Sequence, residues 1–515
     1  MPKTFYITTP LYYVNAKPHI GHAYTEILCD TFARFQKFTG RDVFFMTGTD
    51  EHGTKIEKTA RDQGKEPREY VDAMIPHFKD LWQKLGIEYD YFIRTTEDRH
   101  KKTVQKILLD LEAKGEIYAA DYEGWYSIKS ETFYTESELV DGRCPDTGGE
   151  VQKIVEKNYF FKMSKYQDWL IEYIEKHPDF IRPSYRRNEI LGFLRQPLSD
   201  LCITRPRERL KWGIDYPSSK DHVVYVWFDA LVNYISGAGY GTDEARFKSL
   251  WPADVHVIGK DIIRHHAVYW PVMLKAIGVA MPESILAHGW WTLGGSKVSK
   301  SSGNSVDPVE LMNKYTVDGF RYFLLNEVTV GQDGAYSEDL IRERYRTDLA
   351  NDLGNLFFRA ASMIARYYEG ALPDAAAAAQ KNPLAQQAFG LYDQACAAMK
   401  DYNPRGALEP VFALIVRANQ FVEERQPWKL AKDPAKKDEL AETMFVLADC
   451  LAHAAAILQA FLPATAHKIL TQLNLPSPMK IKNSAEFTKI FVKSGAKIDK
   501  GEPLFPKLED EEEKV

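Results

Sequence analysis

Cysteine is scarce in this chain of 515 residues, which contains five. The five lie far apart, and no two of them have the Cys-x-x-Cys spacing that is typical of a cysteine-rich zinc knuckle. Nor do they form the dense pattern of a small secreted domain held by disulfides. The sequence therefore predicts free thiols in a reducing compartment, which we expect to be the cytoplasm.

Long apolar runs are missing as well. The longest stretch without Asp, Glu, Lys or Arg covers residues 450–467, and it contains His453, Gln459 and Pro463. A membrane-spanning helix needs about 20 predominantly apolar residues, so we expect this stretch to form a helix within a bundle and no contact with a membrane. Residues 1–10 carry one lysine and no long apolar core, and they do not resemble a signal peptide.

The chain also has no excess of basic charge, because 66 Lys and Arg stand against 72 Asp and Glu, a net charge of −6. Binding of nucleic acid through overall basicity is therefore excluded, and any contact with RNA must depend on local residues. Hydrophobic residues make up 45% and charged residues 27% of the chain, the mixture of an ordinary globular protein. The length predicts about three domains.

A βαβ pattern opens the chain. Residues 4–9 are predicted to form a buried strand, residues 22–38 a helix with apolar side chains at helical spacing, and residues 43–47 a second strand. This order indicates a parallel sheet. Ligands of such sheets bind at the carboxyl ends of the strands, where the loops that follow residues 9 and 47 emerge.

The rest of the chain changes character twice. Short aromatic runs separated by turns, from about 116 to 225, predict an inserted module, and the α/β pattern then returns with residues 223–228, 255–259 and a helix over 265–277. After Tyr345 the pattern is helical almost throughout. The predicted helices cover 349–368, 384–401, 408–424 and 439–461, with an Ala/Pro-rich linker at 372–383.

The predicted fold class is therefore α/β, with a Rossmann-type parallel sheet, an inserted connective module and a C-terminal α-helical bundle. The expected domain limits are 1–115 and 226–290 for the two halves of the sheet domain, 116–225 for the inserted module, 291–345 for a loop and stem-contact region, 346–508 for the helical domain and 509–515 for an acidic tail.

Two histidines lie between the first strand and the first helix, in Pro18-His19-Ile20-Gly21-His22. Such a pair is typical of part of a metal site, of a helix-capping pair or of a phosphate-binding pair. The position favours the last of these, because the N–H groups at a helix N-terminus attract anions. Imidazole donors would hold the phosphates of a nucleotide, and Gly21 would let adenine or ribose approach the backbone.

A second motif, Lys297-Val298-Ser299-Lys300-Ser301, has glycines on both sides, which predicts a mobile loop. Lys/Ser runs are usually solvated surface, so the motif alone is weak evidence. Together with the histidine pair it becomes specific. Two lysines on a closing loop would neutralise the charge that develops on pyrophosphate as it leaves a triphosphate.

These two motifs resemble the HIGH and KMSKS signatures of the class I aminoacyl-tRNA synthetases, with Val298 in the place of the methionine. Further segments are similar to the methionine-specific members of that family: Asp50-Glu51-His52-Gly53-Thr54, 133–136, 225–230, 259–262 and 355–359. The resemblance covers residues 4 to about 508. It implies a ligase that activates L-methionine with ATP and Mg²⁺, releasing pyrophosphate, and then transfers methionine to the 3′-terminal adenosine of tRNA(Met), including the initiator tRNA.

The resemblance also implies the roles of particular residues. His19, His22, Lys297 and Lys300 would be catalytic. ATP would be bound by His19, Gly21, His22, Asp261, Lys297, Ser299 and Lys300. Methionine would be bound by Leu11, Tyr13, Asp50, Trp227, Ala230, Tyr234, Ile262 and His266. The anticodon would be read by Asn355, Arg359 and Trp428.

From the residues alone, other interpretations stay open for several of these positions. Asp50, at the carboxyl end of a strand, suits either an α-ammonium group or the capping of its loop. Asp261 is also typical of a helix N-cap. Trp227 and Trp428 are aromatic side chains of the kind more often found in a core than in a binding site.

The chain departs from the family pattern in the inserted module. Relatives carry zinc knuckles there with four ligands, whereas Ser127 and Ser130 stand near where one Cys pair would fall, and Cys144 has no cysteine three positions away. We therefore expect no metal ligands and no zinc. The chain also stops without the additional C-terminal domain of longer relatives, which favours a monomer.

Two other functions would share part of this pattern. A small-molecule nucleotidyltransferase would share the histidine motif but need no RNA, and the long helical C-terminal part argues against it. A non-catalytic RNA-binding relative would have lost activity, and the two intact motifs argue against that.

Overall fold

The computed structural model describes residues 3–130, 132–134, 136–293, 296–297, 306–506 and 508. The chain forms two compact units. Unit 1 consists of Met1–Pro18, Phe44–Gln83 and Glu88–His288, and unit 2 consists of His19–Val43, Lys84–Ile87 and Gly289–Val515. Each unit is described by itself below.

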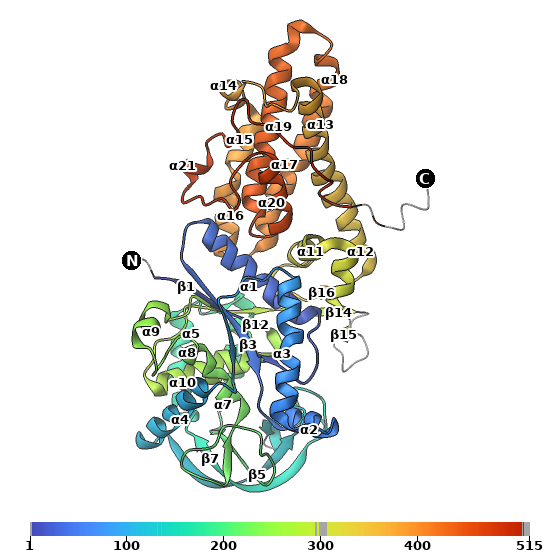
Figure 1. The fold of residues 1–515 in the computed structure, drawn as a ribbon. Helices are drawn as coiled ribbons and strands as arrows, with labels where there is room; N and C mark the ends of the chain where they lie inside the picture. Colours follow the sequence, from blue (N-terminus) through green and yellow to red (C-terminus); the bar gives the residue numbers. More distant parts are fainter. Residues whose placement is uncertain are drawn as a thin grey trace. The chain divides into compact units, whose positions relative to one another are not determined.

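A parallel sheet forms the centre of unit 1 (Figure 1). Its strands follow the order β2 (Tyr12–Tyr13), β3 (Val43–Asp50), β1 (Phe5–Thr8), β12 (Val255–Gly259), β13 (Ile285–His288) and β8 (Ile181–Arg182), and β4 (Tyr91–Arg94) pairs with β3. In the register, Ile7 lies opposite Val255, and Tyr13 lies opposite Asp50. β1, β12 and β13 are apolar runs buried along their whole length, as expected for strands covered on both faces. The predicted α/β fold class is confirmed.

Helices surround this sheet within unit 1. They are α2 (Thr54–Asp62), α3 (Pro67–Lys84), α4 (Asp98–Ala113), α5 (Gln167–Lys176), α6 (Ser184–Phe193), α7 (Val226–Leu231), α8 (Asn233–Ser236), α9 (Glu244–Leu250) and α10 (Trp270–Ile277). Residues 223–228 belong partly to a strand and partly to a helix. β11 (His222–Val224) ends before Tyr225, and α7, which carries the buried Asp229, begins at Val226.

An antiparallel sheet lies within the stretch expected as an inserted module. Its order is β6 (Thr132–Tyr134), β5 (Ile117–Ser127), β7 (Gln152–Phe161) and β9 (Leu201–Cys202). A short pair, β10 (Thr204–Pro206) with β11, follows it. β8 comes from the same stretch of sequence but pairs with β13 in the parallel sheet. This stretch therefore contributes a strand to the parallel sheet as well as forming antiparallel sheets of its own.

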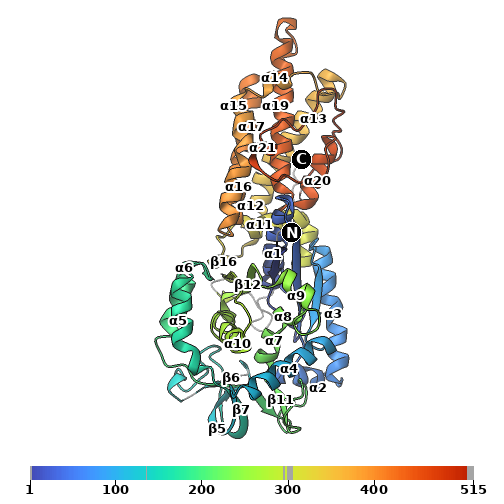
Figure 2. The same ribbon diagram turned by 90° about the vertical axis from the view of Figure 1, so that its left-hand side faces the viewer.

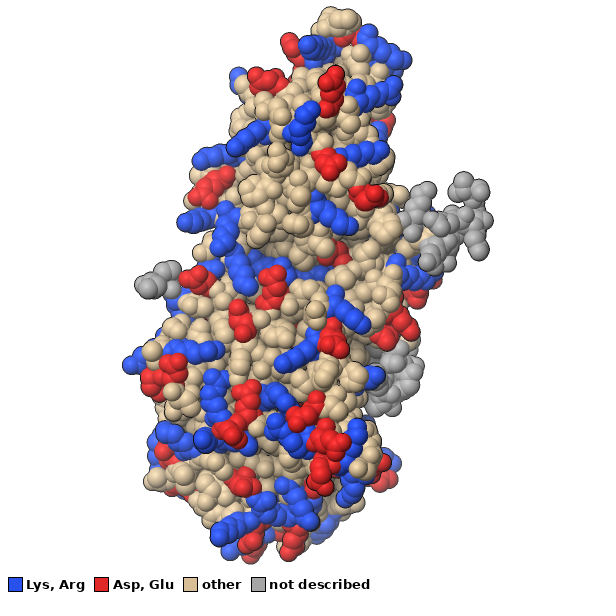
Figure 3. Space-filling view, in the orientation of Figure 1, with Lys and Arg blue, Asp and Glu red and all other residues tan. Residues whose placement is uncertain are grey.

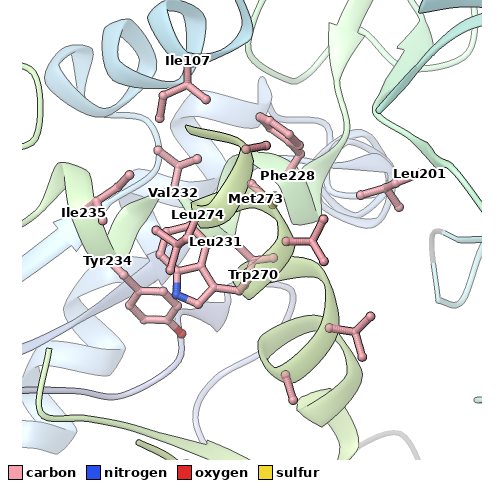
Figure 4. Packing of buried hydrophobic residues seen from close by; sticks show 14 of the residues in the cluster. Ile107, Leu201, Phe228, Leu231, Val232, Tyr234, Ile235, Trp270, Met273 and Leu274 are labelled. Atoms are coloured by element: carbon pink, nitrogen blue, oxygen red, sulfur yellow. The ribbon is translucent and has the colours of Figure 1, made fainter. Parts of the chain in front are cut away.

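The core of unit 1 lies between α4, the α7–α8 segment and α10 (Figure 4). The apolar side chains packed there include Ile107, Phe228, Leu231, Val232, Tyr234, Ile235, Trp270, Met273 and Leu274. Leu11, Tyr13, Trp227 and Ile262 are only partly buried and pack against this cluster. The core thus supports several of the side chains that the sequence assigns to methionine.

Unit 2 contains α1 (Ile20–Phe38), a small sheet and the helical bundle. The sheet consists of β14 (Trp291–Leu293), β15 (Ser296–Lys297) and β16 (Gly334–Ala335). α11 (Pro308–Asn326), α12 (Glu338–Arg344) and a π-helical segment (Tyr345–Gly354) lead into the bundle. The bundle helices are α13 (Asn355–Tyr368), α14 (Ala376–Ala379), α15 (Pro383–Phe389), α16 (Leu391–Lys400), α17 (Pro404–Arg425), α18 (Pro427–Leu430), α19 (Lys437–Leu458), α20 (Pro463–Gln472) and α21 (Ser484–Phe487).

The long helices α13, α17 and α19 lie side by side in the bundle (Figures 1 and 2). The helix expected over 384–401 is broken at Gly390, which separates α15 from α16. Among the described residues, one helical stretch, Pro434–Leu458, is long and apolar enough to cross a membrane, but 94% of its most apolar window is buried. Burial of this kind is typical of the core helix of a bundle, which is what the sequence predicts for the end of this stretch.

Candidate active site

The histidine motif forms the start of α1. His19 is the N-cap, and its Nδ1 accepts a hydrogen bond from the N–H of Gly21 at 3.0 Å. Nδ1 of His22 accepts from the N–H of His19 at 3.3 Å, and the two rings stack with their centroids 3.9 Å apart. The capping interpretation is therefore confirmed. Because Nδ1 accepts in both rings, each neutral imidazole carries its proton on Nε2, so the pair presents two N–H donors.

Gly21 makes this arrangement possible. A Cβ atom at this position would lie 2.9 Å from Cε1 and 3.1 Å from Nδ1 of His19. Any larger residue would push the ring away from the start of the helix. The glycine is thus needed for the cap itself, while its expected contact with a nucleotide remains a prediction.

The lysine motif begins in the small sheet of unit 2. Lys297 ends β15 and lies opposite Thr292 of β14, but its side chain, together with Ser299 and Lys300, lies outside the described residues. Trp291 of β14 meets Tyr24 of α1 edge-on, with ring centroids 5.8 Å apart and planes at 90°. The strand that pairs with Lys297 therefore packs on the same helix that His19 begins.

In unit 1, Asp50 lies at the carboxyl end of β3 and is 8% exposed. The carboxylate of the next residue, Glu51, accepts hydrogen bonds from four donor groups, one of them the Thr49 hydroxyl at 2.7 Å. Arg94 binds both of its oxygens, with Nε at 2.6 Å and the second guanidinium nitrogen at 2.9 Å, and the hydroxyl of Thr96 donates at 2.6 Å. A bidentate guanidinium–carboxylate pair fixes geometry well. The loop that presents Asp50 is therefore rigid on this side.

The other side of the loop is held by a buried chain of polar groups. Nδ1 of His52 lies 2.7 Å from one carboxylate oxygen of Asp229, and Nε2 of His100 lies 2.6 Å from the other. Nδ1 of His100 in turn lies 2.8 Å from the hydroxyl of Ser236. Burial alone would raise the pKa of Asp229, but the two histidines hold it below its ordinary value. The carboxylate therefore ties the loop after β3 to α7, the helix of Trp227.

His52 and Asp229 lie within segments that resemble the family, but their pattern in the sequence predicts no role for them, and none for His100 or Ser236. Only the fold brings them together, because they come from three separate segments of the chain: the loop after β3, α4 and the α7–α8 segment. The signal that the sequence did carry is an aspartate within an otherwise apolar helix segment, Val226–Leu231. A buried carboxylate requires partners.

The predicted methionine pocket contains a second buried pair in unit 1. The hydroxyl of Tyr234 lies 2.7 Å from Nε2 of His266, and Nδ1 of His266 lies 2.9 Å from the carbonyl oxygen of Ile262. A carbonyl only accepts, so the proton of the ring is on Nδ1 and the tyrosine donates to Nε2. Burial lowers the pKa of His266 to about 4. The pair is therefore uncharged near neutral pH.

The remaining predicted pocket residues lie on the same unit. Trp227 and Ala230 are three positions apart on α7, and the ring of Trp227 stands edge-on to His266, with centroids 6.4 Å apart. Tyr13 and Asp50 are partners in the β2–β3 register, and Leu11 is half-buried against the core. Unit 1 thus presents apolar and aromatic side chains together with the buried carboxylate of Asp50 at the end of β3.

Asp261, the residue expected near the ribose, is exposed and lies within a short 3₁₀ helix (Lys260–Ile262). The N-cap of that helix is Gly259, so the interpretation of Asp261 as an N-cap is wrong. A Cβ atom on Gly259 would lie 2.5 Å from Oδ1 of Asp261. The carboxylate folds back over Gly259, and a larger residue there would displace it.

The three predicted anticodon residues are on the helical bundle of unit 2. Asn355 and Arg359 share a face of α13, and Arg359 pairs with Glu423 of α17 at 2.6 Å. Trp428 is 37% exposed on α18. The interpretation of Trp428 as a core residue is therefore wrong. On the face shown in Figure 3, basic and acidic side chains are interspersed, so RNA contact there must depend on particular residues.

In the inserted module, the positions expected to have lost zinc ligands lie together. The hydroxyl of Ser130 is 3.5 Å from Sγ of Cys144, and the hydroxyl of Tyr134 is 3.4 Å from it. Burial alone would raise the pKa of this thiol, but hydroxyl hydrogen bonds from Ser130, Thr147, Tyr134 and Ser127 lower it to about 7. Among the described residues, no three His, Cys, Asp or Glu side chains are grouped so that they would hold a metal ion.

Comparison with known proteins agrees with these motifs. The family model described as "tRNA synthetases class I (M)" matches residues 5–156 and 148–361, and the one described as "Anticodon binding domain of methionyl tRNA ligase" matches residues 372–515. The methionine–tRNA ligase of Caldanaerobacter subterraneus subsp. tengcongensis is 45% identical over 515 residues, which cover 100% of this chain and 80% of the relative. That of Clostridium acetobutylicum is 46% identical over 98% of this chain and 78% of the relative.

The fold is also that of solved structures. The Mycobacterium tuberculosis methionyl-tRNA synthetase in complex with methionyl-adenylate matches with a TM-score of 0.92 and 40% identity, covering 98% of this chain and 100% of that one. The apo form from the same organism matches with a TM-score of 0.84. With matches at this identity over its full length, the chain belongs to the methionine–tRNA ligases, a family of the class I aminoacyl-tRNA synthetases.

Proposed function

We propose that this protein activates L-methionine with ATP, releasing pyrophosphate, and esterifies the 3′-terminal adenosine of tRNA(Met), including the initiator tRNA. The observation that carries the activation step is the capped histidine pair at the start of α1. Its hydrogen bonds fix the proton of each ring on Nε2. Two preorganised N–H donors at a helix N-terminus suit a phosphate that gains charge during the reaction.

Methionine is held by the residues of unit 1. The Asp50 carboxylate pairs with the α-ammonium group, and the Glu51 and His52 anchors on either side keep it in place. Leu11, Tyr13, Trp227, Ala230, Tyr234, Ile262 and His266 surround the side chain. The uncharged Tyr234–His266 pair lets a thioether lie against aromatic rings without meeting a charge, and such sulfur–aromatic contacts are favourable.

In the activation step, an oxygen of the methionine carboxylate attacks the α-phosphorus of ATP in line, and the bond to the bridging oxygen of pyrophosphate breaks. His19 and His22 donate to the phosphate oxygens, and Lys297 and Lys300 neutralise the leaving pyrophosphate. Gly21 and Ser299 contact the nucleotide through the two motifs, and Asp261 accepts from a ribose hydroxyl. Positioning and charge stabilisation account for catalysis of this type.

Mg²⁺ accompanies the nucleotide in this proposal. Mg²⁺ in nucleotide sites is usually held by substrate phosphates and waters with one or two carboxylates. When bound, it would neutralise part of the triphosphate charge. No resident zinc is expected, because the residues around Cys144 in the inserted module carry mainly hydroxyl groups and not the thiolates or imidazoles that bind zinc.

In the transfer step, Asn355, Arg359 and Trp428 recognise the anticodon by hydrogen bonds and by stacking on unpaired bases. Arg359 exchanges its partner Glu423 for the RNA as it does so. We further propose that the protein acts as a monomer in the cytoplasm, where its tRNA substrate is found.

The first experiment is ATP–pyrophosphate exchange with each of the twenty amino acids, followed by charging of tRNA. Exchange with methionine alone, and charging of tRNA(Met) alone, would support the proposal. Exchange with a different amino acid would overturn the assignment of the pocket, and no exchange with any of them would point to a non-catalytic relative.

A further inference from the structure

An exposed aromatic ring lies between two of the proposed anticodon residues. Phe358 is on α13, one position before Arg359 and three after Asn355, and it is 39% exposed. Its neighbours Leu356 and Phe357 are 1% and 2% exposed and belong to the core of the bundle. Phe358 therefore does not serve the packing of this helix as they do. A single exposed apolar side chain is common on a protein surface, so the interest of this ring lies in its place between two proposed RNA-reading residues.

The ring is covered by a cation from a distant part of the chain. Nζ of Lys500 lies 4.0 Å from the centroid of the Phe358 ring. The segment that carries this lysine is fixed on the bundle, because Ile498, Leu504 and Phe505 are buried and Pro506 accepts a hydrogen bond from the hydroxyl of Tyr345 at 2.8 Å. The position of Lys500 over α13 therefore follows from the packing of its segment.

The two cations on this face differ in their partners. Arg359 is paired with Glu423 at 2.6 Å. Lys500 is exposed and, within the described part of the chain, pairs with no carboxylate; its contact is the ring of Phe358. A cation that is not engaged by a carboxylate is available to a phosphate, and an exposed aromatic ring is available to a base. Stacking rings combined with nearby cations are the chemistry by which proteins hold single-stranded nucleic acid.

We propose that Phe358 and Lys500 form an RNA subsite of this protein, in which an unpaired base of the anticodon loop stacks on Phe358 while Lys500 moves from the ring to the phosphate of that nucleotide. The exchange is favourable, because a base stacked on an aromatic ring gains more than an exposed cation–π contact loses. The subsite rests on the proposed reading of the anticodon by Asn355, Arg359 and Trp428, and it adds a contact from the segment after α21.

The test measures the dissociation constant of an anticodon stem-loop RNA by fluorescence anisotropy. We expect Phe358→Leu to weaken binding about tenfold, and Phe358→Trp to keep it, because stacking requires a ring and not merely an apolar side chain. We expect Lys500→Ala to weaken binding several-fold and to reduce the slope of log Kd against log salt by about 0.7, the value for one phosphate contact to a single strand. Lys500→Arg should keep both.

The chain offers matched controls. Tyr367 is on the same helix, nine positions and therefore about half a turn of the wheel away from Phe358, and it has Arg366 over its ring at 5.7 Å. Tyr367→Leu removes a similar cation–π pair from the other side of α13, and Lys468→Ala removes an exposed lysine from α20. Both should leave the dissociation constant unchanged. Thermal unfolding of each variant checks that it is folded.

The outcomes separate the subsite from the function on which it rests. If Arg359→Ala and Trp428→Ala weaken binding but Phe358→Leu and Lys500→Ala do not, the subsite is refuted and the anticodon assignment stands. If none of the four weakens binding, the anticodon assignment itself is wrong. Equal losses for Phe358→Leu and Tyr367→Leu would show a general effect on α13 and would also overturn the subsite.

Discussion

At the scale of single residues, His19 combines two tasks that substitution can separate. Its Nδ1 caps α1, and its Nε2–H is the proposed donor to phosphate. Asparagine is among the best N-cap residues but does not reach as far as Nε2. We expect His19→Asn to keep the thermal stability of the protein while lowering the rate of methionine-dependent ATP–pyrophosphate exchange about 10²–10³-fold, the usual loss when one transition-state donor is removed.

His19→Ala serves as the comparison, since it removes both the cap and the donor and should lower the melting temperature as well. An exchange rate for His19→Asn close to that of the wild type would show that the histidine acts only as a cap.

Because of His266, we expect the free energy of unfolding to fall as the pH falls. Burial lowers its pKa to about 4, below the value of about 6.5 in an unfolded chain. Between these two values the unfolded state binds more protons, so the stability contributed by the neutral ring is complete above pH 6.5 and is lost as the pH falls toward 4. From pH 7 to pH 5 this one group should cost about 2 kcal/mol.

Urea unfolding at the two pH values checks this difference. His266→Gln cannot be protonated, so its loss between pH 7 and pH 5 should be smaller than that of the wild type by about 2 kcal/mol. The comparison between variants is needed because burial also lowers the pKa of His256. Parallel losses in the two proteins would mean that His266 is not held neutral by its site.

At the scale of elements, a buried ion pair joins α1 to α11 within unit 2. The second guanidinium nitrogen of Arg321 lies 2.7 Å from Oδ2 of Asp30, and neither side chain is exposed. Nε of Arg321 also donates to the carbonyl oxygen of Phe461 at 2.9 Å. The helix that begins with His19 is thus tied to the helix that follows the lysine motif and to the end of the bundle's core helix.

Breaking a buried pair by removing one partner leaves an uncompensated charge. Asp30 also accepts from Nε of Arg34 at 2.8 Å and keeps that partner, so we expect Arg321→Met to lower the free energy of unfolding by about 1–3 kcal/mol, as measured in urea. Arg321→Met combined with Asp30→Leu should recover part of that loss, because both charges are then absent. A single variant as stable as the wild type would show that the pair does not hold these helices together.

The inserted module allows a test of the expected absence of zinc. Two pairs of residues have the spacing of a Cys-x-x-Cys motif: Ser127 with Ser130, and Cys144 with Thr147. The three hydroxyls of these pairs surround the Cys144 thiol. We expect the wild-type protein to carry no zinc, and the triple variant Ser127→Cys, Ser130→Cys and Thr147→Cys to bind one ion tetrahedrally. Metal analysis of both proteins after purification measures this. Zinc in the wild-type protein would mean that the site is built from other ligands.

At the scale of the whole molecule, the sequence predicted most of the elements because their signals are local. β1, α1 and β12 carry apolar runs or helical spacing within a few residues, and they lie where they were expected. Residues 223–228 were harder to interpret, since α7 is stabilised there by the partners of Asp229 from distant segments. The same reason explains why the polar chain of His52, Asp229 and His100 and the contact of Lys500 with Phe358 were not predicted. Such contacts depend on residues more than 40 positions apart in sequence.

The proposed activation residues and the proposed anticodon residues occupy different parts of the chain. In the proposed mechanism, activation uses the two motifs and the proposed methionine-binding residues, which end by residue 300, whereas the proposed anticodon residues begin at Asn355. Trp428 is 37% exposed, so its loss removes little packing. We expect Trp428→Ala to form methionyl-adenylate at nearly the wild-type rate but to charge tRNA(Met) with a kcat/KM that is lower by about 10-fold or more, because base stacking of roughly 1–3 kcal/mol is lost. Pyrophosphate exchange and aminoacylation are measured on the same preparation of the variant. Equal losses in both reactions would mean that Trp428 supports the fold and does not read the RNA.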